Sequence, residues 1–274
     1  MIGMTNKIDG VYFKLDGDNA ICHVEYISAK FKQIIKKNLS AICHGTHIHD
    51  YFDDPLYSYQ TTLESFLERY DSKTPETQIG MIGELLSHLL LTELYGDFEV
   101  ASAFFNLEEN SIKKGFDLIL CRTSDKSLWI TEVKSGMLHK GKDHDKTTRE
   151  LLNSAKQDLN KRLNQTEKKY WYNSINSVRS SLHDDKDYKQ TLLKILRGEG
   201  NNAVEKKATS KDNSVVLIAN LFDSMQTKIS LPPVVEFTNK LNNSALFNNV
   251  FVFCIQKETY SKVVDFIRAE ALGV

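Results

Sequence analysis

Long apolar runs are missing from this 274-residue sequence. Their absence excludes a membrane-spanning helix, which needs about 20 consecutive apolar residues. The first ten residues, which include Lys7 and Asp9, also lack the continuous apolar stretch of a secretory signal. The chain has no internal repeat and no low-complexity segment, and its 41% hydrophobic and 26% charged residues are ordinary for a globular protein. We therefore expect a globular protein with no membrane contact.

Cysteine is scarce, and excess charge of either sign is absent. The four cysteines are scattered without a CxxC pair, and Cys121 and Cys254 fall in apolar runs where a free thiol acts as a small hydrophobe. A reducing, cytoplasmic setting fits this usage best. The formal net charge is only −1, so a nucleic-acid partner would have to be met by local basic patches.

Proline is scarce too, and its few positions read as boundaries. Before Pro75, the pattern predicts a hairpin over 11–26, a helix over 28–42 and a mostly helical segment over 52–70. We take residues 1–73 as a small N-terminal α+β subdomain, without an assigned role beyond partner docking.

Residues 74–274 are expected to form the second domain. Thr74 is a plausible N-cap for a Leu-rich helix that ends near Tyr95. The elements expected after it are strands over 98–105, 116–122 and 128–133, a helix over 145–168, a polar helical insertion around 165–213 with one short helix at 188–196 and a loop at 198–213, strands over 215–219 and 250–255, and a final helix over 259–271. Helix–β–β–β–helix–β is the core order of restriction-endonuclease-like folds. The predicted fold class is α/β, a mixed sheet flanked by helices.

Two consecutive predicted strands carry ionisable residues among apolar ones. Asp117 interrupts the apolar segment Gly115-Phe116-Asp117-Leu118-Ile119-Leu120, and a buried carboxylate needs a partner or a metal. Glu132 and Lys134 alternate onto one face of the next strand. If the two strands pair, the three side chains share one small region.

This set of residues suits the hydrolysis of a phosphodiester bond. Two neighbouring carboxylates repel unless a cation lies between them, and hard oxygen ligands suit Mg²⁺, with Mn²⁺ able to substitute. Lys134 could position a metal-bound water or stabilise developing negative charge. The plainer alternative is that Asp117 is a strand-end residue and that Glu132 and Lys134 form an ordinary edge ion pair.

Gly-Phe-Asp followed by Ile-Thr-Glu-Val-Lys resembles the PD-(D/E)xK nuclease signature, with Phe116 at the proline position. Together with Ile82-Gly83-Glu84-Leu85-Leu86 on the preceding helix, it resembles the HamA family, the effector nucleases of the Hachiman antiphage system, and the similar AbpA-type proteins. The resemblance is good over residues 75–135 and rests elsewhere on element order and length.

The resemblance implies further site residues and partners. Glu84 would be a helix-borne catalytic acid and metal ligand beside Asp117 and Glu132. His88, one turn later, and Lys156 and Gln157 on the following helix would lie near the site or contact DNA. The implied activity is Mg²⁺-dependent DNA cleavage, restrained by a HamB-like superfamily 2 helicase. A PD-(D/E)xK fold kept as a silent binding or assembly subunit of a helicase complex is the alternative.

A second candidate metal motif lies at Cys43-His44-Gly45-Thr46-His47-Ile48-His49-Asp50. Thiol, imidazole and carboxylate groups are zinc ligands, but structural zinc sites usually take a second ligand pair from elsewhere, and the rest of the chain offers none. We favour a polar surface loop over a zinc-dependent module.

Overall fold

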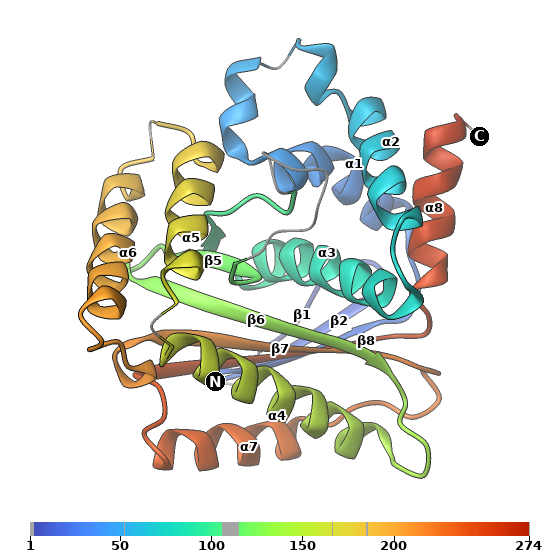
Figure 1. The fold of residues 1–274 in the computed structure, drawn as a ribbon. Helices are drawn as coiled ribbons and strands as arrows, with labels where there is room; N and C mark the ends of the chain where they lie inside the picture. Colours follow the sequence, from blue (N-terminus) through green and yellow to red (C-terminus); the bar gives the residue numbers. More distant parts are fainter. Residues whose placement is uncertain (1–2, 52, 106–114, 166, 185, 274) are drawn as a thin grey trace.

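The apolar segments of the chain pair into one mixed sheet, shown in Figure 1. This computed structural model describes residues 3–51, 53–105, 115–165, 167–184 and 186–273. Within them, eight strands lie in the order β1-β2-β3-β8-β7-β6-β5-β4. Their bounds are β1 (Gly3–Ile8), β2 (Val11–Asp16), β3 (Asn19–Val24), β4 (Phe98–Val100), β5 (Leu118–Arg122), β6 (Leu128–Met137), β7 (Ser214–Phe222) and β8 (Asn249–Lys257).

The middle of the sheet is parallel and its two edges are antiparallel. Strands β6, β7, β8 and β3 run in parallel, whereas β1–β2–β3 and β4–β5–β6 are meanders. Almost every residue of β7 and β8 is buried, as expected for central strands that helices cover on both faces. The predicted mixed α/β architecture is confirmed.

Helices cover the two faces of the sheet in two groups (Figure 1). On one face lie α4 (His144–Leu163) and α7 (Leu231–Asn243), with α5 (Lys168–Ser181) and α6 (Lys189–Val204) beside them. On the other lie α1 (Ala29–His44), α2 (Tyr59–Asp71), α3 (Pro75–Tyr95) and α8 (Ser261–Leu272). Short 3-10 turns occupy Thr46–Tyr51, Pro55–Tyr57 and Ser210–Asp212. The alternate side chains of each strand therefore enter two separate apolar cores.

Most predicted elements are confirmed, and the differences fall at strand ends, at two additional elements and in the polar region. Strand β4 ends at Val100 and β5 begins only at Leu118, so Asp117 precedes its strand. Strand β1 and helix α7 were not predicted, the latter because the Pro232–Pro233 pair was read only as a boundary. The polar region holds two full helices, so the predictions of one short helix and a loop over 198–213 were wrong.

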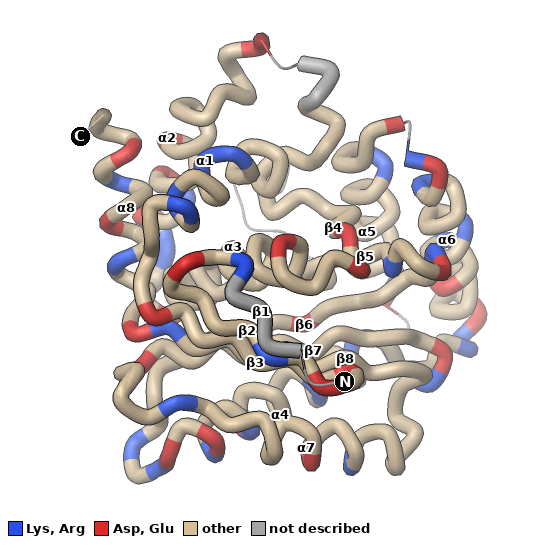
Figure 2. The backbone as a smooth tube through the Cα atoms, turned by 180° about the vertical axis from the view of Figure 1, so that it is seen from behind, with Lys and Arg blue, Asp and Glu red and all other residues tan. Residues whose placement is uncertain are grey.

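The sheet passes across the predicted domain boundary at residue 73. Strand β3 pairs in parallel with β8, from Asn19 opposite Val252 to Val24 opposite Lys257. The two-domain division stays a prediction about folding units, because the strands of both parts form one sheet. In the described part of the chain, no helix combines the length and the apolar character that crossing a bilayer requires. Figure 2 shows Lys and Arg mixed with Asp and Glu over the outer helices.

Candidate active site

Strand pairing brings Asp117 next to Glu132. In the β5–β6 pair, Leu118 lies opposite Thr131, and β6 continues past the start of β5 to Met137. The carboxylate of Asp117 accepts a hydrogen bond of 2.7 Å from the backbone N–H of Val133, which β5 leaves uncovered. The two strands do pair, antiparallel, and the pairing holds the two carboxyl groups close together at the edge of β6.

Alternation along β6 places Glu132 and Lys134 on one face of the sheet and Val133 on the other. Val133 belongs to the apolar core beneath α3, whereas Glu132 and Lys134 face the opposite side, toward α4. The Glu132 side chain is only 1% exposed, and Lys134 Nζ lies 2.9 Å from its Oε1. Such a buried carboxylate is stable only with compensating partners.

Helix α4 supplies one partner for Glu132 and one for Lys134. Arg162 Nη1 donates to Glu132 Oε2 at 2.6 Å and lies 4.0 Å from Asp117 Oδ1. Asp158 Oδ2 lies 2.7 Å from Lys134 Nζ. Asp158 and Arg162 are four residues apart and therefore project from the same side of the helix. Both border the apolar stripe of α4, and that border position was the only sequence signal for them.

The cluster of three carboxylates and two cations alters the protonation of its members. Burial, and then the negative charge of Asp117, raise the pKa of Glu132, although Lys134 and Arg162 oppose the shift. Burial by itself lowers the pKa of Lys134, but the charge of Glu132 and hydrogen bonds to Asp158 and Glu132 outweigh it and raise that pKa. The buried end of the cluster thus favours a bound cation.

The polar insertion helps to fix the Asp117 end of the site. Phe116, which directly precedes Asp117, is fully buried, and its ring lies 5.3 Å from that of Trp171 and 5.9 Å from that of Tyr170, both on α5. Tyr170 also lies beneath the guanidinium of Arg162, at 5.7 Å from its ring centroid. The insertion therefore packs against Phe116, the residue before Asp117, and against the guanidinium of Arg162.

Glu84 is half-buried on α3, on the other side of β6. Its neighbour Gly83 packs against Ser135, the residue after Lys134, so closely that an added Cβ would lie 2.7 Å from the Ser135 Cβ. The Gly83 carbonyl also accepts a hydrogen bond of 3.2 Å from Asn220 Nδ2. The structure thus packs this turn of α3 on the face of β6 opposite the cluster, against the residue that follows Lys134, and the role of Glu84 as a ligand stays a prediction.

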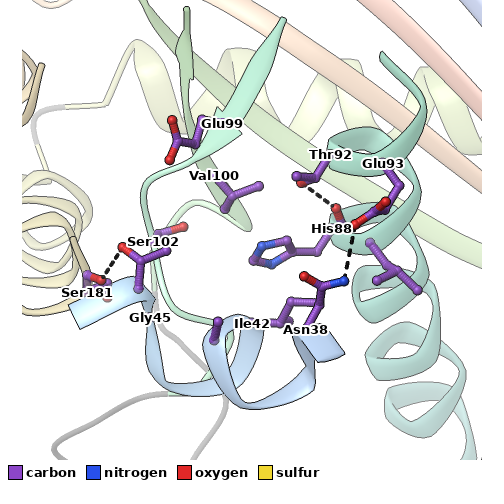
Figure 3. Close-up of a pocket in the computed structure, with 13 residues that line it drawn as sticks. Asn38, Ile42, Gly45, His88, Thr92, Glu93, Glu99, Val100, Ser102 and Ser181 are labelled. Carbon is purple, nitrogen blue, oxygen red and sulfur yellow. Dashed lines mark hydrogen bonds between the residues drawn. The ribbon is translucent and has the colours of Figure 1, made fainter. Parts of the chain in front are cut away.

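His88 lines a pocket between α1, α3 and the segment after β4, with a cavity volume of about 130 Å³. In Figure 3 its imidazole points into this pocket, near the Asn38 amide, which donates to Glu93 Oε1 at 3.1 Å. Asp117, Glu132 and Lys134 are not among the lining residues. His88 therefore belongs to a separate hollow.

The two predicted residues of the following helix lie away from the carboxylates. Lys156 donates to Asn153 at 2.9 Å and lines a groove between α4 and α7, and Gln157 is exposed. Asp158 and Arg162 are the α4 residues that contact the cluster.

The cysteine–histidine segment is partly built into the core. Cys43 is fully buried at the end of α1, and burial raises the pKa of its thiol. The His44 ring packs edge-on against the rings of Tyr57 and Phe105. The side chains of His49 and Asp50 lie outside the described residues. Among the described residues, no three His, Cys, Asp or Glu side chains are grouped closely enough to hold a metal ion.

Asp117 and Glu132 nevertheless fit a magnesium ion by their chemistry. Mg²⁺ is commonly held by one or two carboxylates and takes its other ligands from water and substrate phosphate. The Glu132 carboxylate, 1% exposed, and the neighbouring Asp117 carboxylate, 18% exposed, supply two such oxygen ligands. The other acid of the cluster, Asp158, is 45% exposed and pairs with Lys134.

Comparison with known proteins gives one result. The family model described as HamA matches residues 4–271, which is nearly the whole chain. No curated protein matches the sequence.

Proposed function

Because this chain belongs to the HamA family, we propose that it is an antiphage defence effector that cleaves DNA with Mg²⁺. Family membership supports the role in defence. The nuclease activity, its metal dependence and the restraint by a HamB-like superfamily 2 helicase are our proposal. So is the assignment of the fold to the PD-(D/E)xK superfamily.

The observation that carries the nuclease proposal is the placement of Glu132. Its carboxylate is 1% exposed, yet it adjoins Asp117 and Lys134 at an open edge of β6. An ordinary edge ion pair, the alternative in the sequence, would leave both partners in water. Burial of charge is costly, and ionisable groups perturbed by burial cluster at functional sites. The Asp–Glu–Lys arrangement of PD-(D/E)xK nucleases accounts for this cost.

Asp117 and Glu132 would hold the Mg²⁺, with Glu84 as the further ligand that the family resemblance implies. When bound, the metal would supply positive charge to the scissile phosphate and lower the pKa of a bound water. Lys134 orients Glu132 through its 2.9 Å contact and brings a positive charge to the same edge. Asp158 in turn holds Lys134 in place from α4.

The overall charge of the protein provides little electrostatic attraction for DNA. The net charge is −1, and Figure 2 shows basic and acidic residues interspersed along the helices. We therefore expect weak DNA binding by the chain alone, with the helicase supplying most of the affinity.

Plasmid cleavage by the purified chain, with and without the helicase, tests the proposal. In Mg²⁺, Glu132→Gln and Lys134→Met should each lower the cleavage rate by at least about 100-fold, as the loss of a charged catalytic group does. Glu236→Gln is the matched control, because Glu236 is also paired with basic side chains but lies on α7. Equal rates for the wild type and the Glu132 variant would contradict the assignment.

A silent assembly subunit is the second candidate, and one observation favours it. The cations of Arg162 and Lys134 already compensate the carboxylates, so the cluster is stable without a metal. Calorimetric titration with Mn²⁺ separates the two functions. The nuclease should bind Mn²⁺ and lose the binding on Asp117→Asn, whereas a silent subunit should bind none.

A further inference from the structure

We propose that Arg162 is a built-in competitor of the metal: it holds the carboxylate pair in the metal-free protein and must leave Glu132 before Mg²⁺ can enter. This inference rests on the proposed function, because it takes Asp117 and Glu132 as the metal ligands. It assigns to α4 a part in metal binding that goes beyond the Asp–Glu–Lys pattern.

The geometry places the guanidinium where a shared cation would be expected. Arg162 Nη1 is 2.6 Å from Glu132 Oε2 and 4.0 Å from Asp117 Oδ1, so one group interacts with both carboxylates. Lys134 takes the other Glu132 oxygen, Oε1, at 2.9 Å. Both oxygens of the buried carboxylate are therefore already bound to cations of the protein itself.

A metal ion and this arginine cannot share the same oxygen without a large penalty. Two like charges a few ångström apart repel strongly where water is scarce, and the Glu132 side chain is 1% exposed. Mg²⁺ also requires close, well-aligned oxygen ligands at about 2.0–2.1 Å, which a guanidinium in hydrogen-bond contact obstructs. The affinity for metal is thus lowered by the work of moving Arg162.

Arg162 has other partners within reach when it leaves Glu132. Asp158 precedes it by one helical turn, is 45% exposed, and its charge already acts on the arginine. The Tyr170 ring lies 5.7 Å from the guanidinium carbon. The side chain itself is 24% exposed, so it lies at the border of the site and not deep within it. A rotation of one side chain would therefore open the pair to the metal.

Mn²⁺ titration calorimetry on the purified full chain tests this directly. Arg162→Gln should tighten Mn²⁺ binding by about tenfold or more, because the competing charge is gone. Arg162→Lys, which keeps the charge but not the forked donors, should change the affinity much less. Arg149→Gln is the matched control: Arg149 lies on the same helix and pairs with Glu236 at 3.2 Å, and its removal should leave the affinity unchanged.

Thermal unfolding supplies a second readout that needs no cleavage. In EDTA, Arg162→Gln should unfold at a lower temperature than the wild type, because Glu132 and Asp117 lose a counter-charge. Mn²⁺ should raise that temperature more in Arg162→Gln than in the wild type. If Arg162→Gln does not fold without metal, a rescue of its folding by Mn²⁺ supports the inference, and a failure of Mn²⁺ to rescue it overturns the inference.

The possible failures are distinguishable. If the wild type binds Mn²⁺, Asp117→Asn does not, and Arg162→Gln binds no more tightly than the wild type, the competitor role is wrong and the proposed metal site stands. If neither the wild type nor Arg162→Gln binds Mn²⁺, the metal site itself is wrong, and the inference falls with it.

Discussion

On the α4 side of β6, Glu132 and Lys134 are held by long charged side chains, whereas on the α3 side the next residue, Ser135, meets the backbone of Gly83. The charged contacts end in groups that can rotate to new partners. The contact at Gly83 leaves no space for even one additional carbon atom. One strand thus combines an adjustable face with a fixed one.

This difference indicates how a charged site can change its contacts without loss of alignment. Asn220, which is 1% exposed, donates a hydrogen bond of 2.9 Å to the Ser87 hydroxyl and one of 3.2 Å to the Gly83 carbonyl. It thereby links β7 to α3. These neutral, buried contacts fix the position of β6. Rearrangement of Arg162 on the other face would then leave the strand in place.

The largest expected effect comes from the fixed face. Gly83→Ala would place a carbon atom against Ser135 and force α3 away from β6, which should lower the free energy of unfolding by about 3 kcal/mol. Urea denaturation measures the change. Gly80→Ala on the same helix has no atom within 4 Å of its new Cβ and should be stabilising, by up to about 1 kcal/mol.

The control for the proposed clash is a second substitution on the strand. Ser135→Gly added to Gly83→Ala removes the opposing side chain and should recover about 1–2 kcal/mol of the loss. No recovery in the double variant would show that the glycine is needed for another reason, and the description of this face as tightly packed would then be wrong.

A smaller effect on stability should appear with pH at His44, the last residue of α1. His44 packs between aromatic rings and lies 3.2 Å from the Thr62 hydroxyl, and burial, followed by the charges of Arg69 and His47, lowers its pKa to about 4. The unfolded chain binds a proton to this residue near pH 6.5, but the folded chain does not. Stability should therefore fall as the pH drops from about 6.5 toward 4.

Urea titrations at several pH values test this dependence. His44→Gln should weaken the loss of stability between pH 6.5 and 4. His139→Gln serves as the control, because the imidazole that it removes is 43% exposed. An identical pH slope in the wild type and the His44 variant would refute the assignment.

The smallest expected effect belongs to the outer end of the charged face. Asp158 is 45% exposed, and surface ion pairs contribute little, so Asp158→Asn should change the free energy of unfolding by less than about 1 kcal/mol. The same substitution should lower the rate of DNA cleavage more clearly than it lowers stability, because Lys134 loses the contact that orients it. A stability loss as great as that of Gly83→Ala would remove the contrast between the two faces.

Much of this arrangement could be predicted from local pattern. Alternation placed Glu132 and Lys134 on one face, and apolar segments located the central strands, because these signals act over a few residues. Asp158 and Arg162 could not be singled out, since a charged residue beside a helix's apolar stripe is normally solvated. The missed helix α7 shows another limit: Pro232 and Pro233 stand in its first turn, where proline is well tolerated.

The pairing of β3 with β8 has a consequence for how the protein is made. Residues 19–24 pair with residues 252–257. Strand β3 therefore cannot join the rest of the sheet until β8, more than 200 residues later in the chain, has been translated. At roughly 5–20 residues per second, the ribosome takes at least about ten seconds to supply it. A product that stops before Asn249 leaves β3 without the strand that joins it to β7. Completion of the sheet is thereby tied to completion of synthesis through residue 257.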